Sequence, residues 1–258
     1  MRYAPAVLID PKAIILVTGS AGAIGRAAVN GLVAAGRQVR GFDRTPTPGL
    51  KDFVVGDLTD RDAVQRAASG VGGVVHLAAF PDDDDFLRYL VPSNIVGLYN
   101  VLEAARTSGV KRVVLASTGQ VVWWRLLEGP WPLEVDIPYS PRDWYAVTKI
   151  AAEAAGQAYA RNHAMSILAI RLGWFPRTRE HAAELASTDR GPNLYFSPGD
   201  AARFFSRAIE APLEPGFAPV YAASRPIDRM MFDLEHTKRL LGWEPQDQWP
   251  TGSEHLLA

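Results

Sequence analysis

Residues 13–25 read AIILVTGSAGAIG, a short apolar run followed by glycines at positions 19, 22 and 25. The apolar residues predict a buried strand, and the glycine spacing is typical of a turn that opens a helix. In such a turn Gly19 makes the sharp bend, Gly22 lets the backbone approach a pyrophosphate, and Gly25 lets helix and strand pack closely. The helix N-terminus adds N–H donors and a partial positive charge, so the segment predicts a dinucleotide-binding fold. The alternative is a glycine turn that serves packing alone.

Asp43 ends the next β-rich run, QVRGFD at 38–43, about 20 residues beyond the glycine turn. A carboxylate at this place accepts hydrogen bonds from the ribose hydroxyls of an adenosine and repels a 2′-phosphate. This favours NAD over NADP as the cofactor. Arg44 is the complication, because a guanidinium beside the ribose could accommodate that phosphate.

Short β-rich runs and helical patterns alternate along the rest of the chain. We expect strands at 13–19, 38–43, 52–57, 73–79, 112–118, 166–172 and 218–223, and helices at 22–35, 60–68, 86–107, 143–161, 200–210 and 233–241. Several strands are almost entirely apolar, as in a parallel sheet covered on both faces. The alternation predicts an α/β fold with a Rossmann-type, doubly wound parallel sheet. The Pro-rich stretches are expected to be loops, so residues 1–258 should form a single domain.

Tyr145 and Lys149 lie four residues apart in the predicted helix at 143–161. Residues with this spacing occupy one face of a helix, so the phenol and the ammonium can share a site. A neighbouring cation favours the phenolate and lowers the pKa of the phenol, which suits a general base acting on an alcohol. The spacing is common on helices, and it makes this pair a candidate only in the context of a nucleotide-binding fold.

The composition excludes several classes of protein. Of the 258 residues 48% are hydrophobic and 21% charged, and the formal net charge of -1 shows no bias toward nucleic acid. The chain has no cysteine, which excludes disulfides, thiolate zinc and a cysteine nucleophile. Its start, MRYAPAVLIDPK, lacks the apolar core of a signal peptide, and no apolar run approaches the roughly 20 residues of a membrane span. We expect a cytoplasmic protein without membrane contact.

These features resemble the extended short-chain dehydrogenase/reductase family, also called NAD-dependent epimerase/dehydratases. Further matching motifs follow in order along nearly the whole chain: Asp57-Leu58, His76-Leu77-Ala78-Ala79, the helix with Asn94, Gly97 and Asn100, Ser117-Thr118, and KRLLGWEP at 238–245. The resemblance implies that Tyr145 is the acid/base, that Lys149 lowers its pKa and binds the nicotinamide ribose, and that Thr118 holds the substrate oxygen. Ser117 is expected to face the cofactor or the backbone.

The resemblance and the glycine turn together imply an NAD site. Its expected contacts are Gly19, Ala21, Gly22, Ala23, Ile24, Gly25, Asp43, Arg44, Asp57, Leu58, Leu77, Ala78, Ala79, Asn94, Ser117, Tyr145, Lys149 and Leu172. The chemistry needs no metal, and the four carboxylates of Asp82 to Asp85 are expected to be a solvated loop. Relatives dimerise through the helices at 86–107 and 143–161, which implies a homodimer.

Two departures from the family narrow the substrate. Gly119-Gln120 follow Thr118 where sugar-nucleotide dehydratases have Asp-Glu, so 4,6-dehydration is disfavoured. Little chain remains after residue 172, so residues of about 173–258 are expected to form a reduced substrate-binding lobe that takes a small molecule. Among short members, the chain is most similar to uronate dehydrogenases, which oxidise a hexuronic acid at C1 to a lactone with NAD.

The segments expected to contact substrate are less similar to those enzymes. The candidate substrate-binding residues are Phe80, Thr118, Gln120, Tyr145, Trp174 and Arg177. Arg177 and Arg179 lie in the loop where uronate dehydrogenases have their carboxylate-binding arginine. They are either solvated charges or a clamp for the carboxylate of the substrate. Trp123, Trp124 and Trp131 either line the pocket or fill the core. We expect an NAD-dependent oxidoreductase for a sugar or sugar acid; the alternatives are a sugar epimerase that retains NAD and a non-catalytic dinucleotide-binding regulator.

Overall fold

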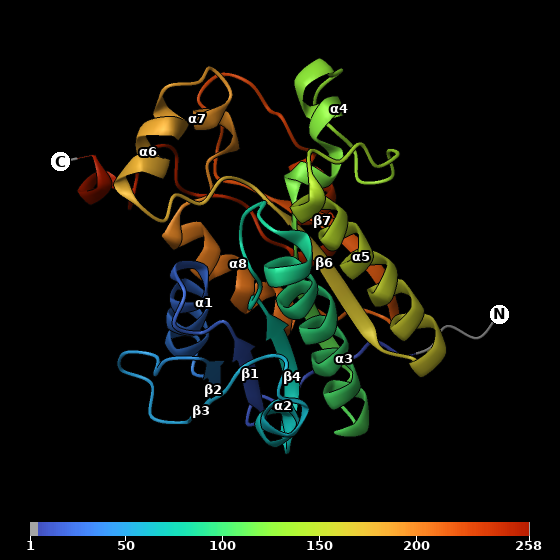
Figure 1. The fold of residues 1–258 in the computed structure, drawn as a ribbon. Helices are drawn as coiled ribbons and strands as arrows, with labels where there is room; N and C mark the ends of the chain where they lie inside the picture. The colour runs from blue at the N-terminus through green and yellow to red at the C-terminus, as the bar shows by residue number, and fades with distance from the viewer. Residues whose placement is uncertain (1–4, 258) are drawn as a thin grey trace.

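A seven-stranded parallel sheet forms the centre of the molecule in the computed structural model, which describes residues 5–257 (Figure 1). The strands are β1 (Ile14–Thr18), β2 (Gln38–Asp43), β3 (Phe53–Val55), β4 (Val71–His76), β5 (Arg112–Thr118), β6 (Ser166–Leu172) and β7 (Gly216–Ala222). Their order is β3-β2-β1-β4-β5-β6-β7, and each neighbouring pair runs parallel. The order reverses direction beside β1, as in doubly wound sheets. The predicted fold class is confirmed.

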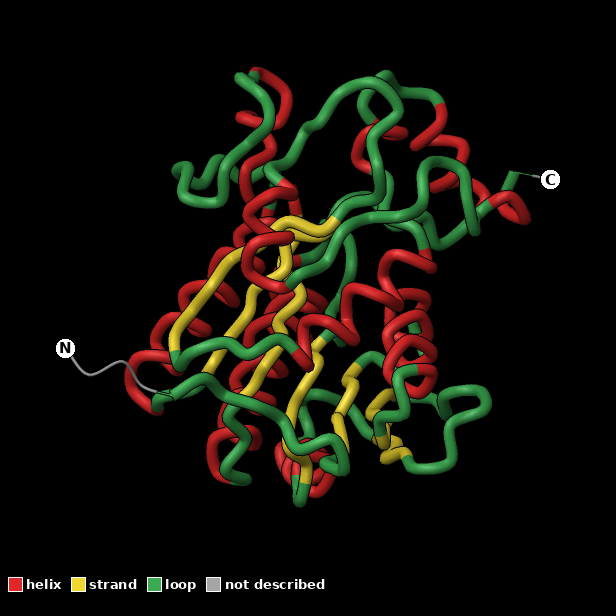
Figure 2. The backbone as a smooth tube through the Cα atoms, turned by 180° about the vertical axis from the view of Figure 1, so that it is seen from behind, coloured by secondary structure: helices red, strands yellow, loops and turns green. Residues whose placement is uncertain are grey.

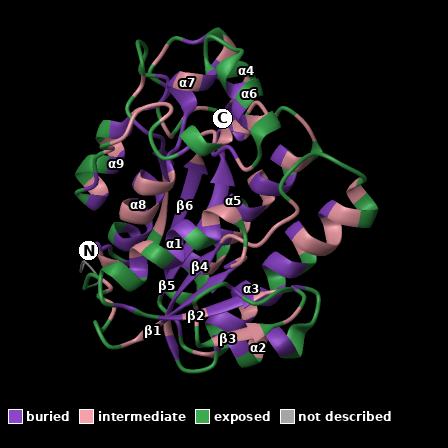
Figure 3. Cartoon of the chain, turned by 90° about the vertical axis from the view of Figure 1, so that its left-hand side faces the viewer, coloured by how far each residue is buried: buried purple, intermediate pink, exposed green. Residues whose placement is uncertain are grey.

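Helices cover both faces of the sheet, because alternate residues of each strand point to opposite sides. The helices are α1 (Ala23–Ala34), α2 (Arg61–Ala68), α3 (Gly97–Thr107), α4 (Trp123–Glu128), α5 (Trp144–His163), α6 (Arg179–Ala186), α7 (Gly191–Leu194), α8 (Pro198–Glu210) and α9 (Leu234–Leu241). Ile15 and Val17 pack with α1 and α8 on one face, while Leu16 packs with α2 and α3 on the other. The strands are accordingly buried between two helical layers (Figures 2 and 3).

The predicted helix at 86–107 consists of two parts. Residues Phe86–Val96 form a π-helix, η1, and Gly97–Thr107 continue as α3. Pro92 lies inside η1 and lacks the N–H that an α-helix needs there, while the N–H of Gly97 reaches the carbonyl of Pro92 with π-helical spacing. The helical period of the sequence therefore located the element without revealing its change of pitch.

Several short elements were not predicted. They are the 3₁₀-helix η2 (Gly119–Val122), α4, α6, α7 and the 3₁₀-helix η3 (Glu254–Leu256). None is longer than 8 residues, and over so short a stretch the helical period carries little signal. In Figure 1, α4, α6 and α7 lie at the top of the view, beyond the ends of the strands. They lie around the carboxyl ends of the strands, which is where parallel α/β folds bind ligands.

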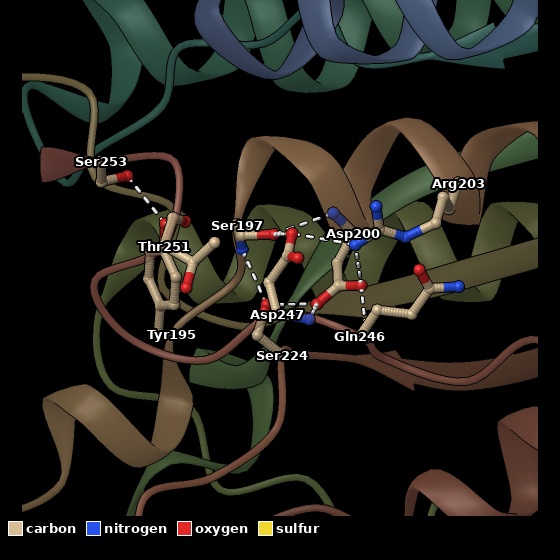
Figure 4. Close-up of polar contacts among 9 residues, drawn as sticks. All are labelled: Tyr195, Ser197, Asp200, Arg203, Ser224, Gln246, Asp247, Thr251 and Ser253. Carbon is tan, nitrogen blue, oxygen red and sulfur yellow. Dashed lines mark hydrogen bonds and ion pairs between the residues drawn. The ribbon is translucent and has the colours of Figure 1, made fainter.

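The C-terminal segment is fastened to α8 by buried polar contacts (Figure 4). Asp200 is fully buried and accepts hydrogen bonds from the Ser224 hydroxyl at 2.7 Å, from the backbone N–H groups of Gln246 at 2.7 Å and Asp247 at 3.0 Å, and from Arg203 at 2.7 Å. Ser224 also donates its backbone N–H to Tyr195. These contacts tie residues 195–200, 224 and 246–247 into one unit.

That unit supports the segment of chain that follows β6. Trp174 donates its N–H to the carbonyl of Leu194 at 2.6 Å, and Phe196 donates its N–H to the carbonyl of Trp174 at 3.0 Å, so residues 194–196 add a short ladder to the chain after β6.

Between residues 5 and 257, no helix has the length and apolar character needed to cross a membrane. The prediction that the start of the chain lacks a signal peptide concerns residues of which 1–4 lie outside the described part.

Candidate functional site

A cavity of about 800 Å³ runs from the glycine turn after β1 to the carboxyl ends of β5 and β6. The predicted residues at its first end are Gly19, Ala21, Gly22, Ala23, Ile24, Gly25, Asp43, Arg44, Asp57 and Leu58, with Leu77, Ala78 and Ala79 in the middle. At the other end lie Ser117, Thr118, Gln120, Tyr145, Leu172, Trp174 and Arg177. The fold thus brings residues from most of the chain into one elongated pocket.

The glycine turn has the geometry that its sequence predicted. Gly19 adopts φ of 72°, and a Cβ on it would lie 2.6 Å from the backbone nitrogen of Ala78. A Cβ on Gly25 would collide with the carbonyl of Gly19. Gly22 caps α1 with no side-chain hydrogen bond, and no acidic residue occupies the first turn. The first N–H groups of α1 are therefore available at the cavity for an anion.

Asp43 and Asp57 place carboxylates at the same end of the cavity. Asp43 accepts hydrogen bonds from the backbone N–H of Ala21 at 3.1 Å and of Thr45 at 3.3 Å, which hold its side chain beside the glycine turn. Asp57 accepts from the backbone N–H of Thr59 at 2.9 Å and from its hydroxyl at 2.8 Å. These hydrogen bonds lower the pKa of Asp57, and the charge of Arg44 adds to the effect.

Thr118 and Tyr145 meet at the opposite end of the cavity. Thr118 is the last residue of β5, and its hydroxyl accepts the N–H of Gln120 at 3.3 Å. Tyr145 lies in the first turn of α5, where the Asp143 side chain caps the helix through the N–H of Ala146 at 2.9 Å. Burial raises the pKa of the Tyr145 phenol, while the charge of Arg177 and a hydrogen bond with Thr118 oppose that rise.

Lys149 lies behind Tyr145 rather than in the cavity lining. Its Nζ is 5.6 Å from the centroid of the Tyr145 ring and donates a hydrogen bond to the carbonyl of Ala116 at 3.2 Å. Burial lowers the pKa of Lys149 to about 8. The pKa of Tyr145 is raised, the opposite of the shift expected from the helical spacing, because burial outweighs the charge of Arg177, which is the cation that favours phenolate here.

Two predicted contact residues, Asn94 and Phe80, have other partners. Asn94 is buried in η1, bonds both backbone groups of Phe80 at 2.7 and 3.1 Å, and donates to the Thr148 hydroxyl at 3.0 Å. Phe80 stacks on Tyr89, with ring centroids 5.1 Å apart. Neither Asn94 nor Phe80 lines the cavity. Both hold the loop after β4 in place, so the structure brings them next to the site but not into it.

Ser117 lines the cavity, but its hydroxyl points to Glu153 and donates to it at 2.6 Å. Glu153 also accepts bonds from Arg171 at 2.9 and 3.0 Å and from the Tyr139 hydroxyl at 2.9 Å. The charged groups of Glu153 and Arg171 are almost fully buried. The network joins β5, β6 and α5 directly beneath Thr118. Sequence reasoning missed it, although Glu153 follows Lys149 at the same helical spacing as Lys149 follows Tyr145.

The acidic run after β4 is part of the site. Asp82 pairs with Arg177 at 2.6 Å, and Asp83 accepts the backbone N–H of Tyr145 at 3.2 Å. The run from Asp82 to Asp85 is exposed, as expected of a solvated loop, and its first two aspartates also line the cavity. The sequence did not predict the contact between Asp82 and Arg177, because the two residues are 95 positions apart.

Of the three tryptophans left open by the sequence, Trp123 lines the cavity. Arg142 stacks on it at 4.8 Å from the ring centroid. Trp124 is exposed, and Trp131 donates to the carbonyl of Leu126 at 2.9 Å outside the lining. Within residues 5–257, no cluster of three or more His, Asp or Glu side chains is arranged to hold a metal ion.

This chain is similar to known proteins in both sequence and architecture. L-arabinose 1-dehydrogenase (NAD(P)(+)) of Haloferax volcanii is 35% identical over 251 residues, covering 92% of this chain and 98% of that protein. Uronate dehydrogenase of Agrobacterium fabrum is 28% identical over 249 residues, covering 94% and 88% respectively. A mutant uronate dehydrogenase from Agrobacterium tumefaciens, complexed with NAD in its crystal structure, superimposes with a TM-score of 0.77 at 28% identity over 95% of this chain and 89% of that one.

The similarity to uronate dehydrogenases that the motifs predicted is thereby confirmed. Residues 15–175, which run from β1 through the Tyr145–Lys149 helix to the chain after β6, match the model of the NAD dependent epimerase/dehydratase family. With the glycine turn, Thr118 and Tyr145 all lying within that match, the chain belongs to the NAD dependent epimerase/dehydratase family.

Proposed function

We propose that the protein oxidises the C1 hydroxyl of a sugar or uronic acid to a lactone, with NAD as the hydride acceptor. It is an NAD-dependent dehydrogenase of the short-chain dehydrogenase/reductase type. The observation that supports the reaction best is the single cavity that joins the glycine turn and Asp43 to Thr118 and Tyr145. One end suits a dinucleotide and the other a small polar alcohol.

The residues at the first end fit a dinucleotide. The uncapped N-terminus of α1 would hold the pyrophosphate, and Asp43 would accept hydrogen bonds from the adenosine ribose. The carboxylate favours NAD over a 2′-phosphorylated cofactor. When bound, NAD supplies a hydride acceptor at the nicotinamide ring.

At the second end, Thr118 and Tyr145 would grip the substrate hydroxyl. The alcohol loses a hydride from carbon and a proton from oxygen, and Tyr145 would take the proton as phenolate. Lys149 and Arg177 place positive charge near Tyr145, which stabilises that phenolate relative to the phenol. The Glu153–Arg171 network keeps the end of β5, and with it Thr118, in a fixed position.

The remainder of the pocket would bind the sugar. We propose that residues 1–258 form one domain in which about 173–258 act as a reduced substrate-binding lobe. Trp174, His181, Glu184 and Phe232 of that portion line the cavity with Gln120 and Trp123. Polar groups mixed with aromatic rings suit the hydroxyl and C–H faces of a sugar ring.

The test follows NADH formation over aldoses, uronic acids, aromatic alcohols and the methyl glycosides of any active sugar. We expect NADH with free sugars or uronic acids, and none with their methyl glycosides, in which the C1 oxygen carries no proton. Oxidation of the glycosides at an equal rate would place the reaction at another carbon. Activity confined to aromatic alcohols would contradict the proposal altogether.

We also propose a homodimer in the cytoplasm. Val96 and Tyr99, on η1 and α3, and Trp144 and Val147, on α5, are large apolar residues with exposed fractions of 37% to 56%. Their burial between two copies would remove apolar surface from water. The absence of cysteine fits a reducing compartment. Sedimentation equilibrium should give twice the chain mass, and substitution of Tyr99 and Val147 by lysine should give the monomer.

A further inference from the structure

Four carboxylates and two guanidinium groups line the substrate end of the cavity. The acidic residues are Asp82, Asp83, Asp143 and Glu184, and the arginines are Arg142 and Arg177. Each arginine is paired with one of the carboxylates, Arg142 with Asp143 at 3.5 Å and Arg177 with Asp82 at 2.6 Å. His181, which also lines this end, adds at most one positive charge. The substrate end is therefore acidic.

Asp82 and Arg177 face each other from opposite sides of this end. Asp82 follows β4, and Arg177 lies in the loop between β6 and α6. The charges of both act on the Tyr145 phenol, Asp82 opposing and Arg177 favouring its ionisation. Arg177 is therefore the guanidinium best placed to bind a substrate anion next to Tyr145, but it already forms an ion pair with Asp82.

We infer that the Asp82–Arg177 pair selects a neutral aldose over a uronic acid, an inference that rests on the proposed oxidation at C1. A uronate carboxylate would have to displace Asp82 from Arg177 and then remain next to the Asp82 carboxylate. Like-charge repulsion makes this costly, because Asp83 and Glu184 add two further carboxylates to the site that neither Arg142 nor Arg177 pairs with. A neutral sugar leaves the pair intact. Its hydroxyl groups donate hydrogen bonds to carboxylate oxygens, which accept charge-assisted bonds readily.

The pair discriminates between the two sugars through the net charge of the site, not through the strength of the ion pair itself. The Asp82 side chain is 60% exposed and that of Arg177 27%. Exposed ion pairs are weak, so opening this one is not the main obstacle to a uronate. The obstacle is that Asp82 stays in the pocket after the pair has opened. Removal of the Asp82 charge should then admit a uronate to Arg177.

The experiment compares D-galactose with D-galacturonate, which differ only in the group at C6, and adds L-arabinose as a neutral pentose. We expect kcat/KM with NAD to be at least about tenfold higher for the neutral sugars. The substitution Asp82→Asn should raise the galacturonate-to-galactose ratio of kcat/KM about tenfold, mainly through a lower KM for galacturonate. Added salt should reduce the discrimination of the wild-type protein, since screening weakens repulsion near the surface.

Asp84→Asn is the matched control. Asp84 belongs to the same acidic run and lies outside the cavity lining, so its substitution should leave the ratio unchanged. A wild-type preference for galacturonate, or an equal change of ratio in the Asp82 and Asp84 variants, would overturn the inference while leaving oxidation at C1 intact. Absence of NADH with every aldose and uronic acid would instead overturn the proposed function.

Discussion

Lys149 is stacked against Tyr145, with its Nζ 5.6 Å from the centroid of the ring and hydrogen-bonded to the carbonyl of Ala116 at 3.2 Å. The lysine is thus bound to the backbone of β5 and lies outside the cavity lining, whereas Arg177 belongs to the lining and is the cation whose charge lowers the pKa of the phenol. The charge of Arg177 offsets part of the cost of ionising this buried tyrosine.

Replacement of Tyr145 by phenylalanine should reduce turnover by roughly 10²–10⁴-fold, the range for loss of acid/base catalysis. Binding of NAD, measured by quenching of tryptophan fluorescence, should persist, because the ring stays in place. Tyr99→Phe, at an exposed tyrosine on α3, is the control and should retain full turnover. A Tyr145→Phe protein with near-normal turnover would remove Tyr145 from the mechanism.

Replacement of Asp43 by serine should shift cofactor preference toward NADP. The carboxylate that repels a 2′-phosphate is lost, while Arg44 remains beside the site to pair with it. We expect the NAD-to-NADP ratio of kcat/KM to fall about tenfold or more. Arg44→Ala is the complementary variant, and it should lower the use of NADP alone. An unchanged ratio in both variants would show that other groups select the cofactor.

His76 should make the protein sensitive to mild acid. Burial lowers the pKa of its imidazole to about 3, and its Nδ1 lies 2.7 Å from the Thr18 hydroxyl. Since the unfolded chain then binds a proton that the folded chain does not, stability falls as the pH falls from about 6.5 toward 3. The free energy of unfolding should drop by up to about 1.4 kcal/mol per pH unit in this window.

Urea denaturation between pH 5 and 6.5 tests this slope. This window avoids Glu103, whose pKa is lowered to about 2 chiefly by its hydrogen bond with Arg106, and whose contribution is lost only below about 4.5. His76→Asn should flatten the dependence, whereas His255→Asn, at an exposed residue, should leave it unchanged. Equal slopes in all three proteins would assign the acid response to other groups.

Replacement of Asp200 by asparagine should destabilise the fold by about 3 kcal/mol, because Arg203 loses its buried partner and several donors lose a charged acceptor. The effect should appear in thermal unfolding. Glu244→Gln breaks the exposed pair with Lys238 and should cost less than about 1 kcal/mol. Equal losses in the two variants would mean that the contacts in Figure 4 add little to stability.

The sequence by itself determined the fold class, the glycine turn and the family. Each depends on local signals, namely buried apolar runs, a glycine spacing that only one backbone path satisfies, and motifs in a set order. Tyr145 and Lys149 were found in the same way, because the period of a helix sets which side chains share a face. Their roles as base and activator stay predictions.

The tertiary structure decided which polar residues meet in the pocket. Asp82 and Arg177 are 95 residues apart, and Ser117 and Glu153 are 36 apart, so no helical or strand period relates the members of either pair. Only the packing of β4, β5, β6 and α5 brings these groups within hydrogen-bond distance. One turn of helix was therefore enough to single out Tyr145 as a candidate, whereas the charge around it depends on long-range contacts that local periodicity does not encode.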